Sequence, residues 1–308
     1  MPAIWIPKRL VEVSLINTAA ESAQSFVRHC ELEYEGRIHS AASEVLASGC
    51  HIVMLTGPSA SGKTTTANKL AAALSARGCP AQVVSLDNFY KNLDDYPRLP
   101  DGTKDYENVT ALDVAEIQKC LGELLEKGET QLPVFDFLTE TRSAQRQPLS
   151  LPGGVCIVEG IHALNPQLTS GLPRSGVYKI YAGLREEYSH KGQRIIPTRD
   201  IRLARRMMRD CKFRGHSLEK TLGMWKGVCA GEDQYIKVFK AEADLLLDTS
   251  FSYEVCLLAA FVAPLAGKLP EEHPHSEMLN SLAGRFALVD TLDEALVPPA
   301  SMLREFLG

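Results

Sequence analysis

Short apolar runs and amphipathic helical patterns alternate through the middle of this 308-residue chain. Apolar runs predict strands at 52–55, 81–86, 155–158, 177–181 and 243–247. Apolar residues at helical spacing separate these runs and predict helices at 64–76, 112–126, 201–211, 218–238 and 253–265. Strands that alternate with helices are typical of a doubly wound parallel sheet. The pattern therefore predicts an α/β fold with a five-stranded parallel sheet flanked by helices.

The two ends of the chain differ from this central alternation. Residues 10–16 are predicted to form a strand, and apolar positions at helical spacing predict one long amphipathic helix at 22–46. Residues 88–108 are rich in Asp, Tyr, Pro and Gly, which is typical of a long functional loop. We therefore expect three parts: an N-terminal extension at 1–49, a main domain at 50–267, and a helical tail at 268–308 that packs on the main domain.

The charge and composition exclude some classes of protein. The formal net charge of −5 gives no general field for nucleic acid or an anionic membrane, so an anion site has to be built locally. No apolar run approaches the roughly 18 residues of a membrane span, and the first residues lack the apolar core of a signal peptide. None of the eight cysteines forms a C-x-x-C pair, which favours free thiols over zinc ligands. We expect a cytoplasmic protein, and the composition leaves a homo-oligomer open.

A glycine-rich motif follows the first of the five predicted sheet strands: Gly57-Pro58-Ser59-Ala60-Ser61-Gly62-Lys63-Thr64, with Thr65 next. It fits the pattern G-x-x-x-x-G-K-[ST], in which the glycines let successive backbone N–H groups converge on phosphate oxygens. The lysine of this pattern reaches the terminal phosphates, and the hydroxyl group holds Mg²⁺. The motif lies between a buried strand and a helix, which is the context that it requires. The sequence therefore predicts a P-loop that binds the phosphate chain of a nucleotide.

Two further predicted strands end in an acidic residue. Asp87 follows the strand at 81–86, and Glu159 follows the strand at 155–158. Ligands of doubly wound sheets bind beyond the carboxyl ends of the strands, where both acids would lie. A kinase needs one carboxylate to take the proton of the attacking hydroxyl group and another to support Mg²⁺. Beside a P-loop, this pair favours a catalytic role over the capping of loops.

One face of the helix predicted at 201–211 carries four arginines: Arg202, Arg205, Arg206 and Arg209. Arg214-Gly215 follows the end of this helix, and the sequence shows no acids matched to the arginines. Guanidinium groups stabilise the charge that develops on a phosphoryl group during its transfer. We therefore expect residues 199–216 to form a lid over the nucleotide, with a basic surface helix as the simpler alternative.

Taken together, these segments resemble the uridine kinase and phosphoribulokinase family of P-loop kinases. The resemblance runs in order over roughly residues 51–250, about two thirds of the chain. The matching segments are Gly57–Thr65, Ser85–Tyr90, Leu132–Phe137, Ile157–Leu164, Arg202–Asp210 and Arg214-Gly215. The tail is similar to that of longer bacterial members described as nucleoside kinases, some of which carry N-terminal modules similar to those of threonyl-tRNA synthetase. Residues 1–50 are too short for such modules.

The resemblance implies a role for each matching residue. It makes Asp87 the general base for the acceptor hydroxyl group, and it places Asp87, Thr64 and Glu159 around Mg²⁺. Lys63, Arg209 and Arg214 would contact the phosphates of ATP. The cofactors implied are therefore ATP and Mg²⁺, and Arg206 would face the acceptor.

The positions that recognise the acceptor depart from the pattern of uridine kinases. Glu107 stands where those enzymes have an aspartate that holds the ribose hydroxyl groups, and Phe135 stands where they have a tyrosine. Glu140 and His216 replace a histidine and an arginine of the base site, and Met224 replaces a glutamine. A site that loses polar partners changes its discrimination between substrates. The phosphate-binding residues thus match the family, while the base-binding residues do not.

We therefore expect an ATP-dependent phosphotransferase that acts on a hydroxyl group of a nucleoside, uridine-like, or of a related small polyol. A kinase of a sugar or sugar acid is the first alternative, because Glu107 and Arg206 could hold hydroxyl or carboxylate groups without a base. A nucleotide-binding regulatory or RNA-associated switch protein is the second alternative, although the negative net charge argues against nucleic acid.

Overall fold

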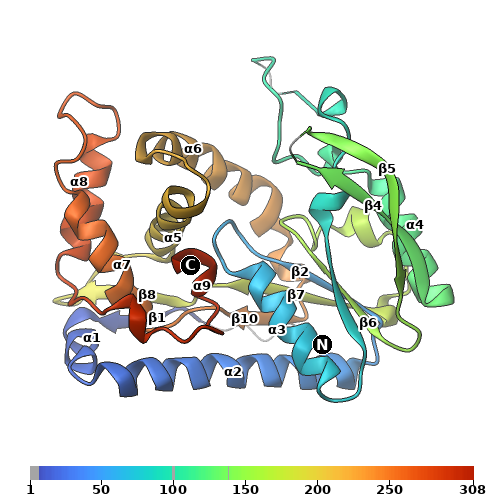
Figure 1. The fold of residues 1–308 in the computed structure, drawn as a ribbon, viewed down its shortest axis with the longest axis horizontal. Coiled ribbons are helices and arrows are strands. Elements are labelled where there is room, and N and C mark those ends of the chain that lie inside the picture. The colour runs from blue at the N-terminus through green and yellow to red at the C-terminus, as the bar shows by residue number, and fades with distance from the viewer. Residues whose placement is uncertain (1–6, 99–100, 138) are drawn as a thin grey trace.

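The computed structural model describes residues 7–98, 101–137 and 139–308, and its centre is a five-stranded parallel sheet (Figure 1). The strands lie in the order β10-β7-β2-β6-β3. Their bounds are β2 (Ile52–Thr56), β3 (Ala81–Ser85), β6 (Val155–Glu159), β7 (Val177–Gly183) and β10 (Leu245–Asp248). They correspond to the five strands that the sequence predicts. The predicted α/β class is therefore confirmed.

Helices cover the sheet and connect its strands. They are α1 (Val13–Ala20), α2 (Ala23–Ser48), α3 (Lys63–Ser75), α4 (Val114–Lys127), α5 (Thr198–Phe213), α6 (Leu218–Gly231), α7 (Glu254–Val262), α8 (Ser276–Phe286) and α9 (Arg304–Leu307). No helix among the described residues combines the length and the apolarity that a membrane crossing needs.

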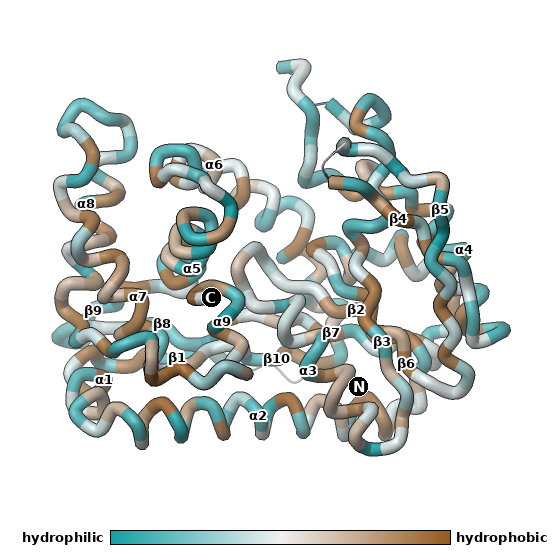
Figure 2. The backbone as a smooth tube through the Cα atoms, viewed as in Figure 1, coloured by the Kyte–Doolittle hydropathy of each residue, from teal (hydrophilic) through white to brown (hydrophobic). Residues whose placement is uncertain are grey.

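Alternate residues of the central strand β2 enter two different cores, which is why its sequence is apolar throughout. Val53 and Leu55 join the core that includes α2, α3, α7 and the C-terminal tail. Ile52 and Met54 face the opposite side and join the core under α4. Figure 2 shows hydrophobic colour on the central strands and alternating hydrophobic and hydrophilic colour along α2. A strand buried on both faces needs such a continuous apolar run.

The structure also contains two smaller sheets that the sequence pattern does not predict. One is an antiparallel hairpin of β4 (Glu129–Asp136) and β5 (Thr141–Ser150). The other joins β1 (Arg9–Glu12) in parallel to β8 (Glu186–His190), which forms a hairpin with β9 (Gln193–Ile196). Most residues of β5 are polar and exposed, so no apolar alternation marks this strand.

Two of the predicted elements are wrong in part. The strand expected at 10–16 ends at Glu12, and Val13 and Ile16 are the buried positions of α1. Their spacing of three residues suits a helix rather than a strand. The helix expected at 218–238 ends at Gly231, and a π-helical turn and a 3₁₀ turn replace its second half. The loop expected at 88–108 contains only short turns among its described residues, and residues 99–100 lie outside them.

Both ends of the chain pack against the P-loop helix α3. Tyr34 of α2 is fully buried, and its hydroxyl group lies 2.7 Å from the hydroxyl group of Thr66. In the tail, Met302 packs where a Cβ atom of Gly62 would lie, and Glu305 accepts a hydrogen bond from Thr65 at 2.7 Å. The tail therefore forms part of the wall beside the P-loop.

Replacing Tyr34 by phenylalanine should reduce the free energy of unfolding by about 1–2 kcal/mol, because the buried hydroxyl group of Thr66 then loses its partner. Urea denaturation measures this change. Tyr178→Phe is the matched control, since the Tyr178 hydroxyl group bonds Glu44 at an exposed position. An equal loss in both variants would contradict the proposed contribution of the buried contact.

Candidate active site

The P-loop forms the predicted turn between β2 and α3. A side chain at Gly57 would collide with the carbonyl oxygen of Ala182 on the neighbouring strand β7. Gly62 has a φ of +79°, in the left-handed region that favours glycine. Both positions thus need glycine because of the backbone conformation and the close packing of the turn. Since α3 begins at Lys63, its first N–H groups point into the turn and form an anion site.

Asp87 and Glu159 lie at the carboxyl ends of adjacent parallel strands. Ser85 of β3 pairs with Glu159 of β6, so the two strands end at the same edge. The Ser85 hydroxyl group donates to Glu159 Oε1 at 3.1 Å and accepts from the Asp87 N–H group at 3.2 Å. One serine therefore fixes both acids relative to each other. The two acids that the sequence singles out share one site.

Cations of the P-loop and of the segment that follows α5 act on these two acids. Burial raises the pKa of Asp87, while the positive charges of Lys63 and Arg214 oppose that rise. Burial also raises the pKa of Glu159, and Lys63 opposes it while the negative charge of Asp87 adds to it. Two carboxylates with raised pKa values next to a lysine and an arginine are typical of a site for phosphoryl transfer.

The residues predicted to surround Mg²⁺ fit a divalent cation. Glu159 Oε2 is buried and has no hydrogen-bond partner in the described part of the chain, and the Thr64 side chain interacts with the same carboxylate. The described residues contain no cluster of three His, Cys, Asp or Glu side chains that could hold a metal by itself. Mg²⁺ in nucleotide sites takes one or two protein oxygens, with phosphate and water completing its shell. Such a small ligand set is what the site offers.

The arginines of α5 are paired with acids, contrary to the expectation from the sequence. Their partners are Glu232 for Arg202, Glu254 for Arg205, Asp210 for Arg206 and Arg214, and Glu305 for Arg209. Three of these acids come from segments distant in sequence from α5. Helical spacing on one element cannot reveal them, so the idea of an unmatched basic face is wrong.

Two of the paired arginines brace the P-loop. Arg202 donates to the carbonyl oxygen of Ser59 at 3.1 Å, and Arg205 donates to that of Ala60 at 3.2 Å. Both side chains are almost entirely buried. A third arginine, Arg206, donates to the Ser59 hydroxyl group at 3.0 Å. The helix therefore fixes the outer turn of the P-loop, in addition to any contact with a nucleotide.

Arg209 and Arg214 differ in their exposure and in their partners. The Arg209 side chain is 15% exposed and contacts Glu305 of the tail at 3.3 Å, and its guanidinium lies 5.8 Å from the Phe306 ring centroid. The Arg214 side chain is 47% exposed and contacts Asp210 at 3.3 Å. The charge of Arg214 acts on Asp87. Of the two, Arg214 thus acts on Asp87, and Arg209 lies where the tail meets α5.

Glu107, which the sequence predicts to bind the acceptor, lies within reach of charges from the P-loop and from α5. Burial raises its pKa, and the charges of Arg206 and Lys63 oppose the rise. Its Cβ and Cγ atoms pack directly on Gly231 of α6, where a Cβ atom would come within 3.0 Å of them. The contact with Gly231 sets the direction of the carboxylate.

Gly231→Ala should therefore displace Glu107 and raise KM for the acceptor several-fold, with little change in KM for ATP. Steady-state kinetics with each substrate varied in turn measures both constants. Gly227→Ala on the same helix is the matched control, because nothing lies within 4 Å of its Cβ position. Equal KM values for the acceptor in the two variants would show that Glu107 does not bind it.

Three residues near Glu107 were not singled out as site residues from the sequence. Asp105 is buried and accepts a hydrogen bond from the Tyr235 hydroxyl group at 3.0 Å. His162 packs against Tyr235, and burial lowers its pKa to about 4. Among the described residues, neither ring nitrogen of His162 has a hydrogen-bond partner of good geometry, although the backbone of Glu107 acts on the ring. A neutral, buried histidine with spare hydrogen-bonding capacity is available to a ligand. The one sequence signal for His162 is its place in the matching segment Ile157–Leu164, shortly after Glu159.

Aromatic side chains form a wall on the β4–β5 side of the site. The contacts run from Tyr106 through Tyr96, Tyr90 and Phe135 to Phe137, with ring centroids 5.1–5.8 Å apart. Phe137 and Tyr106 are more than half exposed at the two ends of this wall. Exposed aromatic faces of this kind can stack on a flat ring.

The remaining predicted acceptor residues lie apart from one another. Glu140 is exposed at the turn between β4 and β5, with a φ of +54°. His216 Nδ1 lies 3.8 Å from Asp210, the acid that pairs with Arg214. Met224 is exposed on α6. His216 is therefore the one of these three that contacts a residue of the arginine lid.

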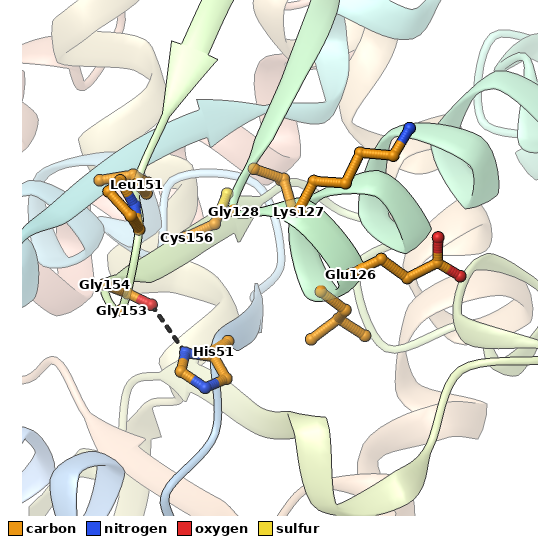
Figure 3. A pocket seen from close by; sticks show the side chains of 11 residues that line it. His51, Glu126, Lys127, Gly128, Leu151, Gly153, Gly154 and Cys156 are labelled. Carbon is orange, nitrogen blue, oxygen red and sulfur yellow. Dashed lines mark hydrogen bonds between the residues drawn. The ribbon is translucent and has the colours of Figure 1, made fainter.

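A cavity of about 330 Å³ opens at the opposite edge of the sheet (Figure 3). It is lined by His51, which precedes β2, and by Cys156 near the start of β6. His51 Nδ1 lies 3.0 Å from the Gly154 carbonyl oxygen, and Glu126 and Lys127 point away from it. Because ligands of such sheets bind at the carboxyl ends of the strands, this cavity is separate from the candidate active site.

The parallel sheet, with a P-loop at the carboxyl end of β2, defines a P-loop kinase architecture. The family model described as "Phosphoribulokinase / Uridine kinase family" matches residues 52–251. The chain belongs to this family.

Individual relatives agree with the family match. The chain is 27% identical to a uridine kinase of Lactobacillus helveticus over 207 residues, which cover 67% of this chain and 90% of that one. It is 28% identical to a uridine kinase of Saccharomyces cerevisiae over 200 residues, which cover 64% of this chain but only 36% of the yeast protein. A solved structure of a possible uridine kinase from Bacillus stearothermophilus aligns with a TM-score of 0.47 at 18% identity, over 70% of this chain and all of that one.

Proposed function

We propose that this protein is an ATP- and Mg²⁺-dependent kinase that transfers the γ-phosphoryl group to a hydroxyl group of a nucleoside or a related small polyol. The observation that carries the proposal is the setting of Asp87, which the Ser85 hydroxyl group holds beside Glu159 and on which the charges of Lys63 and Arg214 act. A base beside two phosphate-binding cations suits transfer to an acceptor hydroxyl group better than the hydrolysis of a nucleotide. Membership in a family of kinases supports the same reading.

In the proposed reaction, Asp87 accepts the proton of the acceptor hydroxyl group as this oxygen attacks the γ-phosphorus. Lys63, Arg209 and Arg214 stabilise the charge on the transferred group, and Glu305 holds Arg209 in place before ATP binds. Thr64 and Glu159 would hold Mg²⁺, with Asp87 next to it. When bound, this ion would neutralise phosphate charge and help to orient the phosphate chain. Glu159 is buried, which limits the access of water to this side of the site.

The aromatic wall supports an acceptor with a flat ring. Phe137 is exposed at one end of this wall and offers an apolar face without a hydroxyl group, so a base would be held there by stacking. Asp105, Glu107 and His162 supply polar groups for sugar hydroxyls on the other side. This combination suits a nucleoside. It would discriminate between bases less strongly than a site with many hydrogen-bonding groups for the base.

A panel of acceptors tests the proposal, with ADP release from MgATP measured in the presence of nucleosides, sugars or sugar acids. We expect turnover with at least one nucleoside and none in the Lys63→Ala variant. Turnover with sugars or sugar acids alone would show that the acceptor is one of these compounds and not a nucleoside. Hydrolysis that no acceptor stimulates, or nucleotide binding without turnover, would contradict the kinase and favour a switch protein.

A further inference from the structure

A second cavity, of about 380 Å³, lies beside the P-loop but does not include its acidic residues. It is bounded by Pro58, by the segment after β7 and by the start of α5. Asp87, Glu107 and Glu159 do not line it. Its volume is within the range of small-molecule sites. The cavity is therefore distinct from the acceptor side of the candidate active site.

The lining of this cavity is strongly basic. Seven of the lining side chains are basic, whereas only Glu187 and Glu232 are acidic. Glu187 pairs with Lys8 and Arg194, and Glu232 pairs with Arg202 and Lys237. Arg199 pairs with Asp233, which does not line the cavity. The lining side chains of this concave surface still carry more positive than negative charge. Such a surface concentrates field lines and attracts anions.

Arg185 is the most unusual of these cations. Arg185 is only 4% exposed, and its Nε and Nη2 atoms have no hydrogen-bond partner among the described residues. The charge of Asp248 acts on this guanidinium, but Asp248 forms its ion pairs with Arg9 and Arg37, and none of the ion pairs of the described residues includes Arg185. A buried guanidinium is costly without a directly paired anion. The backbone is fixed, because the Arg185 N–H group donates to Asp248 Oδ1 at 3.2 Å and to the Ser250 hydroxyl group at 2.8 Å. The structure therefore holds an unpaired guanidinium at a defined place in the cavity wall.

Two further features add positive potential at the same place. Burial and the charges of Arg185, Lys8 and Lys237 lower the pKa of Lys240 to about 8, and its Nζ atom lies 5.4 Å from the Tyr181 ring centroid. These cations therefore repel one another across the cavity. The 16-residue helix α5 begins at Thr198, which also lines the cavity, so the positive end of its dipole lies there. A bound anion would relieve the repulsion and would supply the partner that Arg185 lacks.

We propose that this cavity binds a phosphate-bearing small molecule, with Arg185 as its principal ligand, at a site separate from the P-loop and from the acceptor residues. The phosphate group would accept hydrogen bonds from the guanidinium of Arg185, supported by Lys240. Arg202 links this site to the P-loop, since it lines the cavity and donates to the Ser59 carbonyl oxygen. An occupant therefore acts on the same helix that braces the nucleotide-binding turn.

Calorimetric titration of ribose 5-phosphate, with ribose as the uncharged probe, tests the proposal on the full chain saturated with MgADP. Saturation excludes the P-loop as the binding site, and a second titration into Lys63→Ala excludes it independently of any kinase activity. We expect one ribose 5-phosphate per chain in both titrations and no binding of ribose. Absence of binding in both would overturn the site, whereas the proposed kinase function would stand.

Arg185→Met and Arg194→Met form the matched pair of variants. The Arg194 side chain lines the same cavity but is 58% exposed and already paired with Glu187. We expect Arg185→Met to weaken ribose 5-phosphate binding at least about tenfold, with no fall in melting temperature, and Arg194→Met to change it less than about threefold. Should Arg185→Met fail to fold, Lys240→Gln is expected to weaken binding in its place. Unchanged affinity in the folded variant, or tighter binding of citrate than of ribose 5-phosphate, would contradict the assignment.

Discussion

Asp87→Asn is expected to lower kcat by about 10²–10⁴-fold while binding of MgATP is retained, because an amide cannot accept the proton of the acceptor hydroxyl group. The asparagine keeps the shape of the side chain and the backbone bond to the Ser85 hydroxyl group. The loss should appear in kcat with either substrate at saturation. Stopped assays of ADP release measure kcat, and equilibrium titration with a nucleotide measures binding.

The pH dependence gives a second readout for Asp87. Since burial raises the pKa of this carboxylate, kcat should fall on acidification at a higher pH than an exposed aspartate would produce. The pH dependence of the folding stability has the opposite sign. A carboxylate whose folded pKa is raised favours the folded state when protonated, and that contribution is lost as pH rises through the raised value. Asp87→Asn should thus be at least as stable as the parent protein at neutral pH.

Asp94→Asn is the control for this substitution. Asp94 lies in the same loop region, and its side chain is fully exposed at an ion pair with Lys104. We expect no measurable change in kcat. If Asp87→Asn retained the turnover of the parent, Asp87 would not be the general base.

Glu254→Ala is expected to lower the free energy of unfolding by about 3–5 kcal/mol, because it leaves the guanidinium of Arg205 buried without its anion. Arg205 is completely buried, and two of its nitrogens contact the two carboxylate oxygens of Glu254. The same guanidinium bonds the carbonyl oxygens of Ala60 and Thr249. Losing the pair therefore loosens the contact between α5 and the P-loop. Urea denaturation measures the stability.

Two further variants separate the buried pair from ion pairs in general. Glu294→Ala breaks an exposed pair with Lys212, on the same helix as Arg205, and should cost less than about 1 kcal/mol. The double variant Arg205→Met with Glu254→Leu removes both charges and should recover much of the loss. A double variant as unstable as Glu254→Ala would show that the charge of Arg205 is not the cause.

Much of the phosphate-binding edge could be predicted because each part of it is local in sequence. The P-loop is a continuous motif, and Asp87 and Glu159 directly follow apolar runs that had to be buried strands. Parallel pairing then brings strand ends together without any knowledge of side-chain contacts. The roles assigned to Lys63, Asp87 and Arg214 stay predictions, to be tested by the variants above.

The acidic partners of the arginines of α5 could not be predicted from the sequence. Their spacing predicts a common helix face, and the helix is present. Three of the acids that neutralise them, Glu232, Glu254 and Glu305, stand 30, 49 and 96 residues away along the chain from their arginine partners, so no helical pattern connects them. Burial, not spacing, decides which guanidinium can reach a nucleotide.

The sequence by itself determined the α/β class, the P-loop and the order of the five strands along the chain, because these depend on local periodicity and on one contiguous motif. The tertiary structure alone decided the pairing of the arginines, the packing of the tail on Gly62 and Thr65, and the basic cavity around Arg185. Each of these depends on which distant segments meet in space. The physical reason is that burial and the matching of charges are properties of the folded surface, whereas a sequence pattern reports only the neighbours along one element.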